Sequence, residues 1–199
     1  MELNVKKIIK YLIGIFLIIF GIYAMDYSIY IGHTEWIFWL CYIAMVLIGF
    51  GALTNNSFLI VSQLNLVAIP LIFWIIDFIL YYFFKYTFWG ISHYFFNGLT
   101  LAARIISLEH LFLVPLALIV LYLIKIKNNK AWILSITQLV IFFFLTKYLT
   151  PDSDNINCVF TSCVPFISDS FYIIKWFILG IICILTTNYI LISLPFLKK

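Results

Sequence analysis

Residues 105–124, IISLEHLFLVPLALIVLYLI, form an almost unbroken apolar run that contains two ionisable side chains, Glu109 and His110. About twenty apolar residues are enough for a helix to cross the hydrocarbon core of a bilayer, at about 1.5 Å per residue. Because ionisable side chains in such a span are costly in lipid, they face other helices and mark functional positions by default. The run therefore predicts a membrane helix and directs the search for chemistry to Glu109 and His110.

The composition of the whole chain points to the same class of protein. Its 199 residues are 65% hydrophobic, 20% aromatic and only 10% charged, which fits no soluble class. Since a bilayer interior offers no water to backbone groups, a spanning chain forms helices or a closed barrel, and long continuous apolar runs favour helices. We therefore predict an all-α, polytopic transmembrane helical bundle that forms a single domain, with the lipid bilayer as its partner.

Six apolar runs are long enough to be membrane spans. The first follows a lysine cluster and lacks the small-residue cleavage site of a signal peptide, so we interpret it as a retained helix. The third contains Pro70, which we expect to kink or tilt one long helix rather than to divide it. The predicted spans are residues 8–24, 36–53, 58–84, 105–124, 131–149 and 171–196.

Two connections between these spans are distinctive. Residues 86–104 are rich in aromatic residues but interrupted by glycine and polar residues, which predicts an interfacial or re-entrant segment anchored by Tyr86, Trp89 and Tyr94. Residues 150–170 are the most polar connection in the chain and form a predicted outer loop.

The lysines predict the orientation of the bundle. Six alternating spans bring the two termini, residues 54–57 and residues 125–130 to one side. The basic residues expected there are Lys6, Lys7, Lys10, Lys125, Lys127, Lys130, Lys198 and Lys199. The acidic residues expected on the other side are Asp26, Glu35, Asp152, Asp154 and Asp169. By the positive-inside rule the lysine-rich face is cytoplasmic, in a multi-pass protein of the cell membrane. The net charge of +4 thus reflects topology, and no nucleic-acid partner is predicted.

Four ionisable groups share one predicted depth, about 8–10 Å below the outer surface when residues are counted at helical rise. They are Asp77, Glu109, His110 and Lys175, from three different spans. At a common depth they can pair and so reduce the cost of desolvation. Glu109 and His110 are adjacent, however, so their side chains diverge by about 100° and one of them faces a different neighbour.

This layer has two interpretations. In the first, Lys175 snorkels outward, a carboxylate pairs with it, and His110 is a hydrogen-bonded packing residue. In the second, a water-accessible pocket opens to the outside, and His110 acts there as a general base, proton carrier or ligand, together with Asp77 and Glu109. His93, in the aromatic segment, is a further residue that could approach His110 from above. The candidate contacts to a substrate are Lys175, Arg104, Asn155, Asn157 and Asp152.

The outer loop offers oxygen atoms without a recognisable cation-binding pattern. Pro151 ends the preceding helix, and the segment PDSDNIN that follows contains Asp152, Asp154, Asn155 and Asn157. An Asx-rich turn or helix cap is favoured over a metal site, since no EF-hand pattern is present. No metal site is predicted anywhere, and no cofactor is indicated.

The cysteines fall into two groups. Cys158 and Cys163, spaced C-x4-C on the side expected to be oxidising, form either a disulfide or two free thiols, because spacing alone does not define the Cα separation. Cys41 and Cys183 lie inside spans, where we interpret them as ordinary packing residues.

The stretch ISLEHLFLVP at residues 106–115, together with TPDSDNIN at 150–157, resembles an uncharacterised bacterial family of small membrane-associated proteins. The matching features are a histidine with a proline five residues later, a proline and N-x-N motif after the next span, and a tryptophan–aspartate pair in the preceding span. The residues that match are His110, Pro115, Pro151, Asn155, Asn157, Trp74 and Asp77. The resemblance covers residues 74–159. The sequence departs from the family pattern in the lysine turn KIKNNK, where arginines are usual, and at Cys158, where an aromatic residue is usual. The family implies no established activity.

Two functions of different class follow from the pocket interpretation. One is a module that binds or transports a small molecule, ion or lipid headgroup from the outer side, as a half-transporter that forms a homo-oligomer. The other is an intramembrane enzyme acting on a lipid or lipid-linked substrate, with His110 as acid–base residue and Lys175 holding an anionic headgroup. No nucleophile motif supports the enzyme, and no pair of broken helices supports the transporter. A purely structural membrane protein is the remaining alternative.

Overall fold

The computed structural model describes residues 2–168 and 170–198, and over these residues the chain is an all-α bundle without strands. This confirms the predicted fold class. Asp169 and Lys199, predicted to lie at opposite faces, are outside the described residues. The α-helices are α1 (Glu2–Tyr30), α2 (Leu40–Thr54), α3 (Ser57–Phe84), α4 (His93–Phe96), α5 (Leu101–Ser107), α6 (Glu109–Ile124), α7 (Ala131–Leu149) and α8 (Tyr172–Ser193). The 3-10 helices are η1 (Thr34–Phe38), η2 (Asp152–Asp154), η3 (Ile156–Cys158) and η4 (Pro195–Leu197).

Five helical segments are long and apolar enough to cross a membrane, which confirms the membrane class by length and composition. They are Asn4–Tyr30, Ser57–Phe84, Leu101–Ile124, Ala131–Leu149 and Tyr172–Ser193. The remaining predicted span, the second one at residues 36–53, is divided into η1 and α2. Helix α2 has 15 residues, about 22 Å at helical rise, which is short of a hydrocarbon core of about 30 Å.

The break before α2 has a clear physical cause. Trp39 has extended backbone angles (φ −58°, ψ 122°) and separates η1 from α2. The side-chain amide of Asn157 closes the gap: its Nδ2 donates to the carbonyl of Phe38 (2.8 Å) and its Oδ1 accepts from the backbone N–H of Leu40 (3.0 Å). A side chain distant in the sequence thus replaces the hydrogen bonds of a continuous helix, and sequence periodicity could not reveal it.

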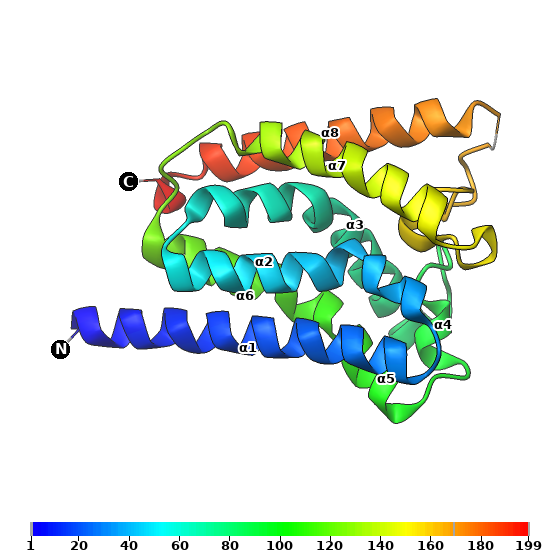
Figure 1. Cartoon of the computed structure of the whole chain (residues 1–199), viewed down its shortest axis with the longest axis horizontal. Coiled ribbons are helices and arrows are strands. Elements are labelled where there is room, and N and C mark those ends of the chain that lie inside the picture. The colour runs from blue at the N-terminus through cyan, green and yellow to red at the C-terminus, as the bar shows by residue number, and fades with distance from the viewer. Residues whose placement is uncertain (1, 169, 199) are drawn as a thin grey trace.

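One end of the bundle carries both termini and two inter-helix connections (Figure 1). Lys10 Nζ donates to Asn55 Oδ1, which ties α1 to the α2–α3 turn. Ile126 N donates to Leu197 O (2.7 Å), and Lys125 Nζ donates to Phe196 O (2.8 Å), which ties the α6–α7 connection to the C-terminal segment. The segments predicted to share a face therefore lie at one end, which we call the lysine end.

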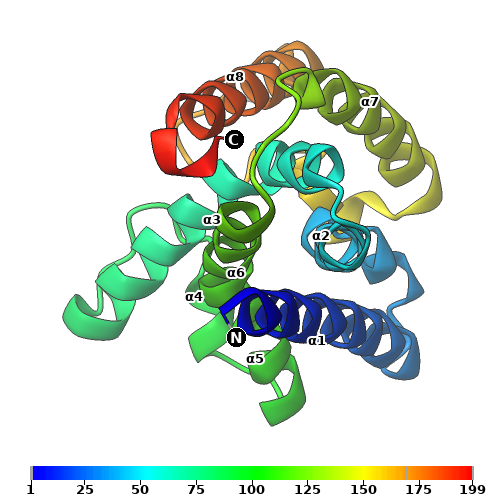
Figure 2. The same ribbon diagram turned by 90° about the vertical axis from the view of Figure 1, so that its left-hand side faces the viewer.

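Helix α3 lies at the centre of the bundle and packs against α2, α6, α7 and α8. In a view along the bundle, α7 and α8 lie on one side and α1 on the other, with α2, α3 and α6 between them (Figure 2). Pro70 lies inside α3, which continues as a single helix as expected. The half of α3 before Pro70 is almost completely buried, so it forms the core, whereas several aromatic residues of the second half are exposed.

The segment between α3 and α6 differs from the predicted division at residue 105. Thr100 caps α5, because its Oγ1 accepts from the backbone N–H of Ala103 (3.2 Å). The helix therefore begins at Leu101, inside the segment predicted to be interfacial, and only α4 with its flanking turns remains of that segment.

Candidate functional site

Glu109 and His110 open α6 directly after a break in the helix at Leu108. In a continuous helix the carbonyl of Ser107 would accept from the backbone N–H of Leu111. Leu111 N instead donates to Leu108 O (2.9 Å), and His110 Nδ1 donates to the freed carbonyl of Ser107 (2.8 Å). The break thus orients the imidazole, and it places Glu109 in the first turn of α6, where the helix dipole favours a negative charge.

The Glu109 side chain is completely buried, and neither carboxylate oxygen accepts a hydrogen bond from any described residue. Burial of a polar group without hydrogen bonds is costly, and burial of a charge without a partner costs more. Native proteins retain few such groups, and each needs an explanation. Glu109 is therefore the strongest candidate for a functional residue among the described side chains.

Two potential ligands surround this carboxylate. His110 Nδ1 lies 3.7 Å from Glu109 Oε1. Cys41, from α2, lies on the other side: its sulfur, a carboxylate oxygen of Glu109 and a ring nitrogen of His110 all lie within 4.8 Å of one another. Sulfur, oxygen and nitrogen from two helices therefore converge on one point. We call Cys41, Glu109 and His110 the Glu109 cluster.

Trp74 of α3 covers His110, and Tyr94 of α4 contacts Trp74; we call these two residues the aromatic cover. The imidazole stacks on the indole of Trp74, with ring centroids 4.5 Å apart and an interplanar angle of 27°. Trp74 Nε1 in turn donates to the hydroxyl of Tyr94 (3.1 Å). The side chain of His110 keeps 16% of its accessible surface. The cluster is thus largely shielded, and His110 is its partly exposed member.

Asp77 lies against the loop that leads into α4 and accepts hydrogen bonds from it. Its Oδ1 accepts from the backbone N–H groups of Phe88 (2.9 Å), Trp89 (3.0 Å) and Gly90 (3.4 Å), and its Oδ2 accepts from the N–H and the hydroxyl of Ser92 (3.0 and 2.9 Å). This buried carboxylate is therefore saturated by the loop that leads into α4. It holds the aromatic cover in place rather than facing Lys175.

The predicted layer of four groups is thus brought together only in part. Glu109 and His110 lie side by side, and Asp77 anchors the loop whose continuation, Tyr94, contacts Trp74. Lys175 Nζ donates to the carbonyl and hydroxyl of Ser168 (3.0 and 2.5 Å), and none of the described ion pairs joins it to a carboxylate. Arg104 is exposed on α5.

Two of the candidate substrate contacts in the outer loop hydrogen-bond to backbone groups of the chain. Asn155 Oδ1 accepts from the backbone N–H groups of Phe160 and Thr161 (3.0 and 3.1 Å), and its Nδ2 donates to Thr161 O (2.9 Å). Asn157 bridges η1 and α2, as described above. Both asparagines have left-handed backbone angles, which asparagine tolerates better than most residues. Asp152 is exposed.

The cysteines of the outer loop are bridged. Cys158 and Cys163 form a disulfide, with Cα atoms 5.6 Å apart. Cys41 and Cys183 are free thiols.

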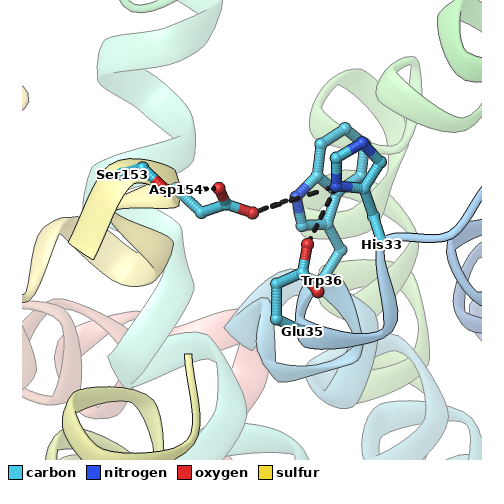
Figure 3. A network of polar contacts seen from close by, with 5 residues as sticks. All are labelled: His33, Glu35, Trp36, Ser153 and Asp154. Atoms are coloured by element: carbon cyan, nitrogen blue, oxygen red, sulfur yellow. Dashed lines mark hydrogen bonds and ion pairs between the residues drawn. The ribbon is translucent and has the colours of Figure 1, made fainter. Parts of the chain in front are cut away.

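A second polar cluster joins the two loops at the end opposite the lysine end (Figure 3). Asp154 Oδ2 accepts from Trp36 Nε1 (3.0 Å), and His33 Nδ1 lies 2.8 Å from Glu35 Oε1 and 3.9 Å from Asp154 Oδ2. The imidazole of His33 stacks on Trp36. Burial raises the pKa of Asp154, but hydrogen bonds from Trp36 and Ser153, the interaction with Glu35 and the nearby His33 outweigh burial and lower the pKa. Because each of these groups has a partner, the cluster holds the two loops together. We call His33, Glu35, Trp36 and Asp154 the clasp.

Two features were missed in the sequence. Cys41 carries no spacing signal toward Glu109, because it belongs to a different helix. The other feature is a polar seam in the half of α3 near the lysine end: Asn65 Nδ2 donates to Ser135 Oγ (3.1 Å) and Asn188 Oδ1 (3.2 Å), and Gln63 Nε2 donates to Gln138 Oε1 (3.0 Å). Such hydrogen bonds join helices in membranes. The sequence signal for this seam was the presence of single amide side chains within apolar runs, at Gln63, Asn65, Gln138 and Asn188.

Comparison of the chain with protein-family models, with curated proteins and with solved structures finds no match. The resemblance to a family of small membrane-associated proteins thus stays a prediction.

Proposed function

We propose that the protein is an integral membrane protein that binds or transports a small cation at Glu109, away from the lysine end. The observation that carries this proposal is the carboxylate itself, which is fully buried and accepts no hydrogen bond from a described residue. Such a group is stable when it is protonated or when a positive ion neutralises it. In either state Glu109 is a position that takes up a cation, the proton included.

In this proposal the protein lies in the cell membrane with its lysine end in the cytoplasm. The positive-inside rule supports this orientation, since lysines near both termini and in the α6–α7 connection gather at that end. The disulfide between Cys158 and Cys163 supports it as well, because disulfides persist in oxidising compartments. Glu109 then lies in the outer half of the membrane.

A cation is better supported than an anionic headgroup. The basic residues expected to hold a headgroup are placed elsewhere, with Lys175 hydrogen-bonded to Ser168 and Arg104 exposed on α5.

An enzyme acting on a lipid-linked substrate, with His110 as acid–base residue, is the alternative. It predicts that His110→Gln abolishes turnover while binding at Glu109 persists.

Dicyclohexylcarbodiimide tests the proposal, because it modifies protonated carboxyl groups in apolar surroundings. The purified full-length protein would be labelled across a pH series and in the presence of NaCl, MgCl2 or ZnCl2, and the modified residues identified by mass spectrometry. We expect labelling at Glu109 that at least one of these cations suppresses. Asp77 is the internal control: it is equally buried, but its oxygens are occupied by backbone donors, so it should stay unlabelled.

The variant Glu109→Gln should lose this modification without change at other positions. The proposal is refuted if Glu109 is never labelled, or if neither pH nor any of the three salts alters its labelling.

A further inference from the structure

We infer that the cation held by the Glu109 cluster is a divalent transition metal ion of the zinc type, coordinated by Cys41, Glu109 and His110. This inference rests on the proposed function and names its ligand. Its basis is geometric, since the sulfur, the carboxylate oxygen and the ring nitrogen lie within 4.8 Å of one another. A small adjustment brings three atoms at such distances to one ion, whose bonds to sulfur, nitrogen and oxygen are about 2.0–2.3 Å.

The types of ligand atom select the metal. Calcium and magnesium require several oxygen ligands, and this cluster supplies one carboxylate. A thiolate and an imidazole beside a carboxylate suit zinc and its neighbours among the first-row metals. Three protein ligands leave one position of a tetrahedral ion open, as in zinc sites that bind water or substrate.

Charge balance favours a divalent ion over a monovalent one. Binding of the ion displaces the thiol proton of Cys41 to solvent, so that the Cys41 thiolate and the Glu109 carboxylate together carry two negative charges, and the imidazole of His110 binds metal in its neutral form. A divalent ion makes the loaded cluster neutral. Neutrality matters here because Glu109 is fully buried, and an uncompensated charge in such a place is strongly unfavourable.

The surroundings resemble the support that metal-binding histidines receive elsewhere. The Nδ1–H of His110 donates to the Ser107 carbonyl, which leaves Nε2 as the ring nitrogen that binds the ion, and the ring stacks on Trp74. Outer contacts of this kind orient ligands in metal sites. The second group of candidate ligands, His33, Glu35 and Asp154, lacks the decisive feature, because each of its members has a partner.

The first experiment needs only the wild-type protein. Cys41 and Cys183 are both free thiols within helices, so they can be compared in one sample. The rate of alkylation by N-ethylmaleimide would be followed by mass spectrometry for each cysteine, with and without ZnCl2. We expect zinc to slow the alkylation of Cys41 at least tenfold and to leave Cys183 unchanged. Equal rates at Cys41 with and without zinc overturn the inference.

The second experiment uses cobalt as a spectroscopic probe of thiolate ligation. Wild-type protein titrated with CoCl2 should develop thiolate-to-cobalt charge-transfer absorption. The Cys41→Ser variant should lose this absorption, whereas Cys183→Ser, the matched control, should keep it. Competition with zinc should show an affinity loss of at least about 100-fold in Cys41→Ser, since losing even an outer-shell partner costs about 10- to 100-fold. Cobalt absorption that persists in Cys41→Ser overturns the inference.

These outcomes are separable from those of the proposed function. If Na⁺ or protons control carbodiimide labelling of Glu109 while zinc and cobalt leave Cys41 untouched, the cation site stands and the metal is wrong. If Glu109 labelling responds to no cation, both fail.

Discussion

His110 donates its Nδ1 proton to the carbonyl of Ser107 across 2.8 Å, at the point where Leu108 interrupts the helix. This bond joins local structure to chemistry, because it satisfies a carbonyl that the helix has released and determines the tautomer of the imidazole. The same break makes Glu109 the first residue of α6. The arrangement of the candidate site therefore depends on one side-chain-to-backbone hydrogen bond.

Replacing His110 by Phe isolates the contribution of this bond. Phenylalanine preserves the aromatic stacking on Trp74 but cannot donate to Ser107, whose carbonyl is then unpaired. We expect the variant to be less stable by about 1–3 kcal/mol, the usual cost of an unsatisfied buried group. Unfolding in a fixed detergent, followed by circular dichroism, measures the difference. His33→Phe is the control: it removes a hydrogen bond to Glu35 from a ring that keeps 45% of its accessible surface, so it should cost less.

Asp77 anchors the loop that precedes α4, so its removal should loosen the aromatic cover. Asp77→Ala leaves the N–H groups of Phe88, Trp89 and Ser92 without their acceptor. Since hydrogen bonds to charged groups contribute about 1.5–3 kcal/mol, we expect a loss of stability of at least about 2 kcal/mol and faster hydrogen exchange over residues 85–97. Asp152→Ala, at an exposed carboxylate, should change neither quantity. Unchanged exchange in Asp77→Ala would show that the loop is held by other contacts.

The sequence predicted the class of fold and one part of the candidate site. Apolar runs of about twenty residues predict membrane helices because the bilayer leaves few alternatives, and Glu109 and His110 stand out in such a run for the same reason. Depth counting placed Asp77 and Lys175 in the same layer, but depth does not determine which way a side chain points around its helix. The Asp77 carboxylate accepts hydrogen bonds from backbone N–H groups of the following loop, and the Lys175 ammonium donates to Ser168. The approach of Cys41 to Glu109 depends on how α2 packs on α6, which no local pattern encodes.

Helices α1 and α2 pack closely at glycines, so side-chain volume there should be poorly tolerated. A Cβ atom added to Gly49 would lie 2.5 Å from the carbonyl oxygen of Gly14. We expect Gly49→Ala to destabilise the protein by about 1–3 kcal/mol, the typical cost of overpacking. Gly180→Ala is the matched control. Its added Cβ meets the end of the Leu139 side chain at 2.9 Å, which can move, so its cost should be smaller. Equal costs in thermal unfolding would contradict this account of the α1–α2 contact.

The clasp between the two loops away from the lysine end should open in acid, because the pKa of Asp154 is lowered in the folded protein. Although burial raises this pKa, the hydrogen bonds from Trp36 and Ser153, the interaction with Glu35 and the proximity of His33 outweigh burial. A carboxyl group with a lowered folded-state pKa contributes stability above its unfolded value, ordinarily 3.8, and that stability is lost as the pH falls through the folded value. We therefore expect the outer loop to loosen below about pH 4.

Hydrogen exchange of residues 33–38 and 152–158 between pH 3 and pH 6, corrected for intrinsic rates, measures this opening. Wild-type protein should lose protection in these segments at the acid end of the series, while the core half of α3 keeps its protection. Asp154→Asn removes the titrating group, so its protection should be lower at pH 6 and nearly independent of pH. A wild-type profile as flat as that of Asp154→Asn would show that Asp154 does not hold the clasp. The Trp36–Asp154 bond would then be a consequence of the loop arrangement, which the disulfide and Asn157 would maintain without it.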